Sequence, residues 1–458
     1  MRIHILGICG TFMGGLALLA RELGFEVEGS DAHVYPPMST QLEAAGIRLK
    51  EGYDPGHLQP EPDQVVIGNA LSRGNPAVEY ILDHGLDYVS GPQWLAQTVL
   101  RDRHVLAVAG THGKTTASSI LVWILEAAGL EPGFLIGGVP VDFGCSARLG
   151  GGRHFVIEAD EYDTAFFDKS SKFIHYAPQT LVINNIEFDH ADIFRDLEDI
   201  KRQFHHLVRI VPASGRLLCR RGDANIEAVL ERGCWTPVEF FGVQDGEVCG
   251  GPDWEASLLS ADGCRFSVSR DGQVQGKVSW DMAGAHNVDN ALAAIAAAAH
   301  AGIEPETACG AVSRFRGVRR RLEQYASAGG ITLYDDFAHH PTAIRATIAA
   351  LRNRIGNKRL IAVLEPRSNT MRMGVHRDEL ADSLAGADLM YLFQPADLGW
   401  DLAAATTQLD DRCRVFTSTE TLIEALATTA RAGDHVLIMS NGGFEGLHGR
   451  LAGRLESA

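Results

Sequence analysis

The sequence predicts an α/β protein of three domains, and three observations support this prediction. The chain has 458 residues, whereas one domain usually holds roughly 100 to 200. Three times along the chain, an apolar strand leads into a glycine-rich or polar loop and then into a helical segment. Hydrophobic residues make up 45% of a composition with 49 glycines and 17 prolines, as in globular proteins with many tight turns. We expect the domains at residues 1–101, 102–319 and 320–458.

The first domain is expected to alternate strands with helices. Strand-like runs lie at residues 3–6, 26–29 and 64–68, and helical runs lie at residues 38–45 and 77–84. The charged segment Arg101–His104 marks the end of this domain.

The second and third domains are expected to show the same alternation. The second begins with a strand at residues 105–109 and ends with a helix near residues 288–299. Residues 215–280 are rich in Gly, Val and Cys with short alternating runs, which predicts a small inserted antiparallel sheet. Further strands are expected in the second domain at residues 155–157 and 180–183, and in the third at residues 331–334, 360–364, 389–393 and 435–439.

Charge and cysteine content exclude several classes of protein. Lys and Arg number 41 against 58 Asp and Glu, a formal charge of −17, so no long-range field favours a nucleic-acid backbone. The eight cysteines are scattered and form no CxxC pair. This pattern argues against a zinc ribbon, a redox pair or a disulfide framework, and it predicts a reducing compartment.

No membrane segment is expected. The apolar run Ile3–Ala20 resembles a signal peptide only superficially, because His4 and several glycines interrupt it, and we interpret it as strand, turn and helix. The Ala-rich run at residues 291–301 is much shorter than the roughly 20 apolar residues that span a bilayer.

A phosphate-binding loop is expected between the strand at 105–109 and the helix that follows. Backbone N–H groups and the helix dipole would converge there on a phosphate, Lys114 would add a point charge, and Thr115 is placed to bind Mg²⁺. Val108 stands where the usual pattern has its first glycine, so the loop is a shortened variant. The alternative is a glycine turn with an exposed surface lysine. The residues of the loop are Gly110, Thr111, His112, Gly113, Lys114, Thr115 and Thr116.

Acidic residues follow two further strands of the second domain. Glu158–Asp163 comes after the strand at 155–157, and Asn184–His190 after the strand at 180–183. Such strand ends face the nucleotide cleft of an α/β sheet, and their oxygens are ligands that suit Mg²⁺. Taken alone, either run could instead be a solvated loop.

The first domain carries a second glycine-rich loop. Residues 7–15 follow the first strand, and Ser30 and Asp31 end the next, as in sites for a diphosphate and a ribose. A dinucleotide fingerprint needs glycine where Cys9 stands. From the pattern alone, NAD, another nucleotide diphosphate and a purely structural turn all remain possible ligands or roles.

Taken together, these motifs resemble the Mur ligase family over all three domains. The motifs are GTHGKTT at 110–116, EADEYD at 158–163, NNIEFDH at 184–190, GAHNVDNA at 284–291 and YDDFAHHP at 334–341. The resemblance implies a three-domain fold in which Rossmann-like N-terminal and C-terminal domains flank a P-loop-type ATPase domain. It further implies that ATP phosphorylates a carboxylate and that an amine then displaces the phosphate.

The resemblance also assigns roles to individual residues. Lys114, His190, Arg320 and Arg321 would be catalytic, the arginines at the γ-phosphate. Thr115, Glu158 and His190 would bind Mg²⁺, the last two holding the second ion. Asn287 and Asn290 would face adenine, and Asp335 or Asp336 would contact the ribose or join domains. The residues expected to hold a UDP-sugar are Gly7, Gly10, Thr11, Phe12, Met13, Ser30 and Asp31.

One position departs from many relatives. Those proteins carry a carbamylated lysine about 15 residues beyond the Asp-His pair, and His205 stands here instead. Histidine forms no such carbamate, so that group is not carried over. His205 could bind the metal as a neutral imidazole, or it could be a packed residue of an apolar helix.

Within the family, residues 4–15 and 30–42, the segment Glu365–Met371 and the segment Ser440–His448 are similar to the murein peptide ligases. The implied reaction joins UDP-N-acetylmuramate to the murein tripeptide L-alanyl-γ-D-glutamyl-meso-diaminopimelate, in the cytoplasm of a Gram-negative-type bacterium that recycles its cell wall. His339, Arg367 and Asn369 would bind the peptide. Arg367 could instead be a solvated surface arginine, with Arg372 and Arg377 nearby.

Other functions remain as alternatives. A UDP-N-acetylmuramate–L-alanine ligase would use the same chemistry with a smaller amine. A folylpolyglutamate synthase would lack the first domain, and a nucleotide sensor or NAD-linked oxidoreductase would not need two acidic strand ends. The sequence does not indicate an oligomeric state.

Overall fold

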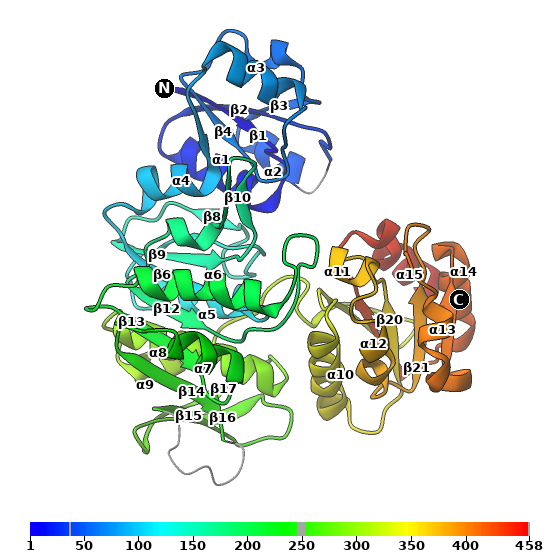
Figure 1. The fold of residues 1–458 in the computed structure, drawn as a ribbon. Coiled ribbons are helices and arrows are strands. Elements are labelled where there is room, and N and C mark those ends of the chain that lie inside the picture. The colour runs from blue at the N-terminus through cyan, green and yellow to red at the C-terminus, as the bar shows by residue number, and fades with distance from the viewer. Residues whose placement is uncertain (36–37, 245–252, 457–458) are drawn as a thin grey trace.

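The described residues of the computed structural model contain three large sheets, each built from a separate stretch of sequence, and one two-stranded hairpin (Figure 1). The structure describes residues 1–35, 38–244 and 253–456. Pro36 and Pro37, which belong to one of the segments that resemble the peptide ligases, lie outside the described residues. Residues 245–252 of the expected insert, with Cys249, lie outside them as well.

The N-terminal domain is a five-stranded parallel sheet in the order β3-β2-β1-β4-β5. Every strand and helix expected from the sequence is present, with ends shifted by one or two residues. Buried apolar side chains cover both faces of the sheet, as parallel sheets require. The elements are β1 (Arg2–Leu6), α1 (Thr11–Glu22), β2 (Glu26–Asp31), α2 (Met38–Ala44), β3 (Arg48–Glu51), β4 (Gln64–Ile67), α3 (Pro76–His84), β5 (Tyr88–Ser90) and α4 (Gly91–Leu95).

The central domain is one continuous sheet of ten strands in the order β17-β16-β15-β14-β13-β12-β6-β9-β7-β8. Its middle strands are parallel, and two pairs at one edge and one pair at the other are antiparallel. The strands are β6 (His104–Ala109), β7 (Gly133–Leu135), β8 (Ala147–Arg148), β9 (His154–Ala159), β12 (Thr180–Ile183), β13 (Arg216–Arg220), β14 (Val238–Val243), β15 (Trp254–Leu258), β16 (Arg265–Arg270) and β17 (Gln273–Ser279).

The expected antiparallel insert is present, but it is not a separate sheet. β13 and β14 continue the parallel sheet, and β15 pairs parallel with β14 before the chain turns back through β16 and β17. The buried residues Trp254, Phe266 and Val268 join the same core as Leu106 and Val108 of β6, and this shared core explains the continuity.

Helices cover both faces of the central sheet. The Ala-rich helix α8 (Ala285–His300) packs against α5 (Lys114–Ala127), because its many small side chains allow close approach. On the other face, apolar residues of α6 (Leu197–Ile210) lie in a core that includes residues of β1 and α1. This shared core joins the N-terminal and central domains. The remaining helices are α7 (Ala224–Glu231) and α9 (Pro305–Val312).

A short hairpin leaves the central sheet directly after β9. It consists of β10 (Asp163–Ala165) and β11 (Asp168–Ser171), and a 3₁₀ turn at Lys172–His175 follows. Phe166 packs against the N-terminal core, and Phe167 meets Tyr88 edge to face with ring centroids 5.2 Å apart. The sequence analysis did not identify this hairpin.

The C-terminal domain is a six-stranded sheet in the order β18-β19-β23-β20-β21-β22, parallel apart from the β18–β19 pair. Three of its four expected strands have the predicted ends, and β19 runs two residues further. The elements are β18 (Glu323–Ala328), β19 (Ile331–Asp336), α10 (Pro341–Ile355), β20 (Leu360–Leu364), α11 (Asn369–Arg372), α12 (Arg377–Leu384), β21 (Leu389–Phe393), α13 (Leu402–Ala405), β22 (Cys413–Phe416), α14 (Thr419–Thr429), β23 (His435–Met439) and α15 (Leu447–Glu456).

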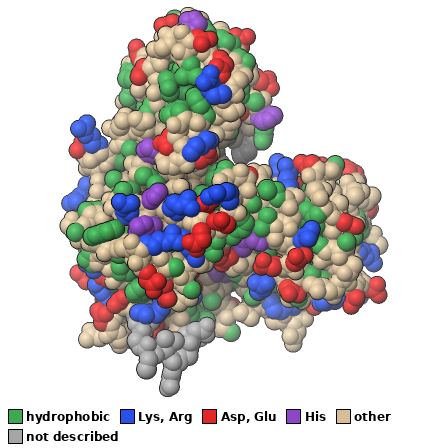
Figure 2. All heavy atoms as spheres, in the orientation of Figure 1, with side chains coloured by type: hydrophobic (Ala, Val, Ile, Leu, Met, Phe, Trp, Pro, Cys, Tyr) green, Lys and Arg blue, Asp and Glu red, His purple; other side chains and the backbone are tan. Residues whose placement is uncertain are grey.

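The three domains form a bent arrangement, with the N-terminal domain stacked on the central one and the C-terminal domain at its side (Figure 1). On the face in Figure 2, basic and acidic side chains are interspersed. Among the described residues, no helix is long and apolar enough to cross a bilayer. The seven described cysteines are unpaired.

Candidate active site

The phosphate loop lies between β6 and α5, as expected. Gly113 has a left-handed φ of +79°, and a Cβ there would collide with the Asn290 side chain, so both conformation and space require glycine. Asn185 accepts hydrogen bonds from the N–H groups of Thr111 and His112 and thereby fixes the loop. No side chain caps α5, so the N–H groups of its first turn remain free to bind an anion.

Lys114 is largely buried rather than an exposed loop lysine, because it sits between the loop and the acidic residues after β9. Its Nζ donates to Glu161 Oε2 at 2.6 Å and lies 3.9 Å from Asp160 Oδ1. Burial opposes its charge, but the carboxylates of Glu161, Asp160 and Glu158 outweigh this effect and raise its pKa. Lys114 therefore carries its charge at the mouth of the loop.

Thr115 and Glu158 form a compact pair of oxygen donors. The Thr115 hydroxyl donates to Glu158 Oε1 at 2.9 Å, and the Gly137 N–H donates to Glu158 Oε2 at 2.7 Å. Arg321 Nη2 donates to Thr115 Oγ1 at 3.1 Å. Burial raises the pKa of Glu158, although the charges of Lys114 and Arg321 and the Gly137 N–H favour its ionised form. A hydroxyl and a carboxylate of this kind fit Mg²⁺.

His190 belongs to a second group of donors, with Asp160 and Glu161. Their ligand atoms lie within 4.8 Å of one another, and His190 Nε2 is 3.1 Å from Glu161 Oε1. Burial disfavours the imidazolium, but the hydrogen bond to Glu161 and its charge raise the pKa of His190. The structure thus groups His190 with these two carboxylates, and Glu158 with Thr115.

Asparagines line the cavity next to the phosphate loop. Asn184 Nδ2 donates to Asn290 Oδ1 at 3.2 Å, and Asn290 Nδ2 lies 3.4 Å from Asn287 Oδ1. All three side chains are buried, and those of Asn287 and Asn290 project from the first turns of α8. An amide pair at this place offers both donors and acceptors to a planar base.

Arg320 and Arg321 point in different directions. Arg321 reaches Thr115 in the central domain. Arg320 is bound within the C-terminal domain, through Asp335 Oδ2 at 3.0 Å and the carbonyl of Ser440 at 2.7 Å. Asp335 Oδ1 also lies 3.0 Å from His448 Nε2. Both arginines line the cavity, and of the two it is Arg321 that contacts the phosphate loop, through Thr115.

In the N-terminal domain, the glycine-rich loop after β1 is held by Asp31. Gly7 has a φ of +79°, and Asp31 Oδ2 accepts the Cys9 N–H at 2.9 Å. Ser30 Oγ lies between His4 Nε2 at 2.9 Å and His57 Nδ1 at 3.1 Å, so it is buried in a structural network. Gly10 begins α1 without a side-chain cap, and the exposed Thr11 follows it at the edge of the cavity.

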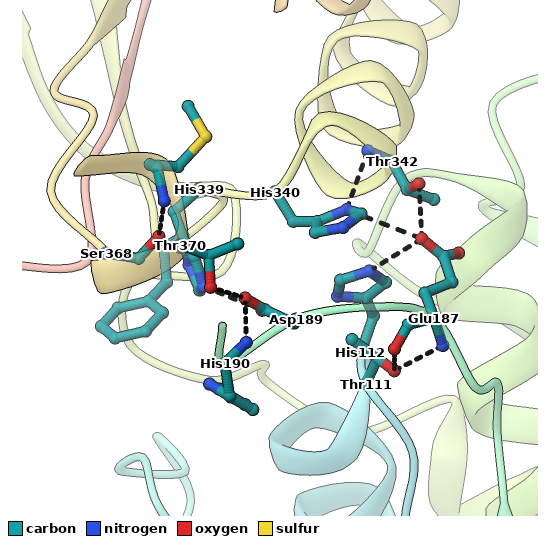
Figure 3. A network of polar contacts seen from close by, with 12 residues as sticks. Thr111, His112, Glu187, Asp189, His190, His339, His340, Thr342, Ser368 and Thr370 are labelled. Atoms are coloured by element: carbon teal, nitrogen blue, oxygen red, sulfur yellow. Dashed lines mark hydrogen bonds and ion pairs between the residues drawn. The ribbon is translucent and has the colours of Figure 1, made fainter. Parts of the chain in front are cut away.

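Side chains of the C-terminal domain meet the Glu187–Asp192 segment (Figure 3). Thr370 Oγ1 donates to Asp189 Oδ1 at 2.6 Å, and Asn369 Nδ2 donates to Asp192 Oδ2 at 2.9 Å. His339 Nε2 lies 3.8 Å from Asp189 Oδ2. These contacts place the C-terminal domain against the nucleotide side of the central sheet.

One cavity of about 890 Å³ connects these groups. Its wall combines Thr11, Met38 and Gln41 of the N-terminal domain with the phosphate loop and with His339 of the C-terminal domain. A cavity at the carboxyl ends of parallel strands, lined from three domains, can bring a nucleotide and two further substrates together.

Family models match almost the whole chain. The Mur ligase family catalytic domain matches residues 2–103, the Mur ligase middle domain residues 108–298, and the Mur ligase glutamate ligase domain residues 320–442. The chain belongs to the Mur ligase family.

Three members of the Mur ligase family show where the chain stands within it. It is 56% identical to the UDP-N-acetylmuramate–L-alanyl-γ-D-glutamyl-meso-2,6-diaminoheptandioate ligase of Escherichia coli (strain K12), over 98% of this chain and 97% of that one. A crystal structure of a murein peptide ligase from Psychrobacter arcticus shares 49% identity, with a TM-score of 0.77 over 100% of this chain and 99% of that one. The UDP-N-acetylmuramate–L-alanine ligase of Burkholderia cenocepacia is 32% identical, over 99% and 98% of the two chains.

Two residues to which the sequence analysis gave a role lie away from the groups described above. Arg367 is not part of the cavity wall, and His205 is remote from both groups of donors. Arg367 is 43% exposed, packs over Gly442 and lies 3.9 Å from Glu365 Oε1. His205 projects from α6 toward Trp235, with ring centroids 6.4 Å apart, and its Nε2 is buried without a hydrogen-bond partner. His205 is in neither of the two groups of donors found among the described residues.

Two residues of the site, Lys172 and Thr342, were not identified from the sequence. Lys172 is buried, and its Nζ lies 3.2 Å from Asp160 Oδ2 and 5.4 Å from the ring centre of Phe12. Glu187 and Thr342 join the central and C-terminal domains through a 2.8 Å hydrogen bond. The sequence gives little indication of these contacts, because each partner comes from a distant segment.

Proposed function

We propose that this Mur ligase joins UDP-N-acetylmuramate to L-alanyl-γ-D-glutamyl-meso-diaminopimelate, with ATP and Mg²⁺. The reaction would proceed through an acyl phosphate and would reuse peptide recovered from the cell wall, in the cytoplasm of a Gram-negative-type bacterium. The main support is 56% identity over nearly the whole chain to a ligase named for these substrates, against 32% to an L-alanine ligase.

The physical reason for activating the sugar acid first is that a carboxylate is a poor electrophile until one oxygen becomes a phosphate leaving group. In our proposal, the first turn of α5 and Lys114 bind the β- and γ-phosphates. Arg321 approaches the same phosphates from beside Thr115. Asn287 and Asn290 contact the adenine base.

Two groups of side chains would hold magnesium. Thr115 and Glu158 provide oxygens at the phosphate loop. Asp160, Glu161 and His190 provide a second set of ligand atoms. Bound at these places, Mg²⁺ would neutralise charge that develops on the transferring phosphoryl group.

The two remaining substrates would enter from the flanking domains. The loop with Gly7, Gly10, Thr11, Phe12 and Met13, together with Asp31, is proposed to bind the UDP-sugar. Ser30 would support this site from behind, since it is buried between His4 and His57. His339, Arg367 and Asn369 are proposed to bind the peptide. Asn369 already contacts Asp192, so it would act at the joint between domains.

The proposal is tested by incubating the purified protein with ATP, Mg²⁺ and UDP-N-acetylmuramate, with and without tripeptide. We expect ADP release that depends on both substrates, and a product with the mass of the two joined minus one water. ADP release without this product would contradict the proposed reaction. Release that does not require the UDP-sugar would contradict the assignment of the first domain.

A further inference from the structure

Three side chains from distant segments converge at the joint between the central and C-terminal domains (Figure 3). His112 comes from the phosphate loop, Glu187 from the segment after β12, and His340 from the residue before α10. One ligand atom from each lies within 4.8 Å of the other two. The proposed Mg²⁺ sites contain none of the three.

The distances within this cluster are long for hydrogen bonds. His112 Nε2 lies 3.4 Å and His340 Nδ1 lies 3.6 Å from Glu187 Oε2, whereas a charge-assisted N–H···O bond is about 2.7 to 2.9 Å. Two donors that each lie about 2.1 Å from a tetrahedral Zn²⁺ are about 3.4 Å apart. The observed spacing therefore matches the edges of a tetrahedral metal site better than a hydrogen-bonded network.

Buried nitrogen atoms without partners provide a second observation. His340 is only 4% exposed, and its Nε2 has no hydrogen-bond partner in the described part of the chain. His376 packs edge-on against it with ring centroids 4.4 Å apart, and its Nε2 is also buried and unpartnered. Buried polar atoms normally have partners, so two adjacent imidazoles with an unpartnered nitrogen each make this joint unusually polar for a packed contact; the nitrogen of His340 that faces Glu187 is Nδ1.

The charge states of the cluster suit a metal ion. Burial lowers the pKa of His340 to about 3, and the neighbouring His112 and His376 lower it further, so its imidazole is neutral at pH 7. Burial favours a neutral Glu187, but its contacts with His112 and Thr342 lower its pKa to about 2.

Thr342 orients the cluster. Its hydroxyl donates to Glu187 Oε2 at 2.8 Å, as residues behind a metal-binding carboxylate commonly do. Its N–H donates to His340 Nδ1 at 3.2 Å and thereby caps α10. A metal ion at Nδ1 would replace this single long hydrogen bond with a coordinate bond.

We propose that His112, Glu187 and His340 form a binding site for a transition-metal ion of the Zn²⁺ class. Two imidazoles and one carboxylate select Zn²⁺ or Co²⁺ over Mg²⁺, which prefers oxygen donors. Because His112 belongs to the phosphate loop and His340 to the C-terminal domain, the ion ties these two domains together.

The test is titration of the untagged, Mg²⁺-free protein with Co²⁺ alone, followed by absorption of the tetrahedral ion, and with Zn²⁺ by calorimetry. Glu187→Gln keeps the shape of Glu187, and His340→Asn keeps a capping group for α10. His190→Ala disrupts the other cluster, and His175→Ala removes a histidine that is paired with Asp168 at 2.8 Å.

We expect one tetrahedral Co²⁺ ion per chain, with its affinity reduced more than about a hundredfold in Glu187→Gln and His340→Asn, as for loss of a direct ligand. Affinity should be unchanged in His175→Ala and His190→Ala. Zn²⁺ should also raise the Tm of the wild type but not of Glu187→Gln. The proposal is overturned if no tetrahedral Co²⁺ spectrum appears, or if His190→Ala removes binding while His340→Asn retains it.

Discussion

In this structure, Glu161 binds the ammonium group of Lys114, and bound ATP would need the same positive charge. The salt bridge keeps the lysine buried and charged, ready to exchange one anionic partner for another. Loss of Lys114 leaves Glu161 with His190 as a partner, so part of the network persists.

We predict that Lys114→Ala lowers the rate of ligation by about a thousandfold, because a cation aimed at a transferring phosphoryl group contributes several kcal/mol. The measurement is kcat with saturating substrates, and circular dichroism serves as the folding control. A folded variant that kept more than about a tenth of the wild-type rate would show that Lys114 does not act on the phosphates.

Arg367 is proposed to bind a carboxylate of the peptide. It lies three residues beyond β20, at the carboxyl end of the strand, and its exposed guanidinium packs over Gly442. The tripeptide has several free carboxylates, and a guanidinium binds a carboxylate through two parallel hydrogen bonds.

For Arg367→Ala we predict a KM for tripeptide that rises at least about tenfold, as for loss of about 1.5 to 3 kcal/mol of charge-assisted hydrogen bonding. The KM for ATP should barely change. The matched control is Arg377→Ala, an arginine that is also exposed and pairs with Asp378. An unchanged tripeptide KM in Arg367→Ala would rule out this role.

At the scale of elements, the β10–β11 hairpin joins the N-terminal domain to Asp160 of the central domain. Phe166 and Phe167 pack against the N-terminal domain, and Lys172, directly after β11, binds Asp160. Lys172 Nζ also lies over the ring of Phe12, in the loop proposed to bind the UDP-sugar. The hairpin thus connects that loop with one of the proposed metal ligands.

We predict that Lys172→Met raises the KM for UDP-N-acetylmuramate by about tenfold, because both Phe12 and Asp160 lose a buried cation. Lys172→Arg keeps a cation at this place, so its KM should stay close to that of the wild type. Lys169→Met is the matched control, since Lys169 lies on the same hairpin, exposed and paired with Asp163. Equal effects of the Lys169 and Lys172 variants would refute a specific role for Lys172.

Elements with strong local patterns could be predicted from the sequence. β12, β20, β21 and β23 have the expected ends, because buried strands of parallel sheets are continuous apolar runs. The hairpin could not be predicted, since Asp163–Ser171 is short and mostly polar, and packing on another domain stabilises it. The insert was predicted as a separate sheet, whereas its strands extend the central sheet. Local sequence patterns do not show this pairing, because it joins strands from distant parts of the chain.

The same distinction holds for the site. Lys114, Thr115, Glu158, His190, Asn287 and Asn290 follow strands or begin helices, so the fold alone brings them to one edge of the sheet. Whether Arg320 or Arg321 faces the loop depends on a left-handed φ of 61° at Arg320 and on its partners Asp335 and Ser440. Those contacts form only when the C-terminal domain has folded.

For the whole molecule, the end of the central sheet opposite the phosphate loop contains a cluster of histidines. His104 and His300 both contact Thr180 Oγ1, at 3.0 and 2.7 Å, and His154 packs beside His104. Burial, followed by the charges of His154 and His300, lowers the pKa of His104 to about 4. Burial lowers the pKa values of His154 and His300 as well.

We predict that these histidines destabilise the fold in acid. In the unfolded chain His104 binds a proton near pH 6.5, but in the folded chain it stays neutral until about pH 4. The free energy of unfolding therefore falls as pH decreases through this window. The measurement is Tm against pH for the wild type and His104→Gln, which keeps a group able to bond Thr180. A pH profile as steep in the variant as in the wild type would contradict this origin.

The central claim is that this Mur ligase adds a peptide rather than a single amino acid. The most direct measurement supplies equal concentrations of the tripeptide and L-alanine to one reaction with ATP, Mg²⁺ and limiting UDP-N-acetylmuramate, and determines the product ratio by mass. We predict a tripeptide product in excess of about a hundredfold, equivalent to a difference of about 2.7 kcal/mol in transition-state binding. A majority of the L-alanine product would contradict the claim.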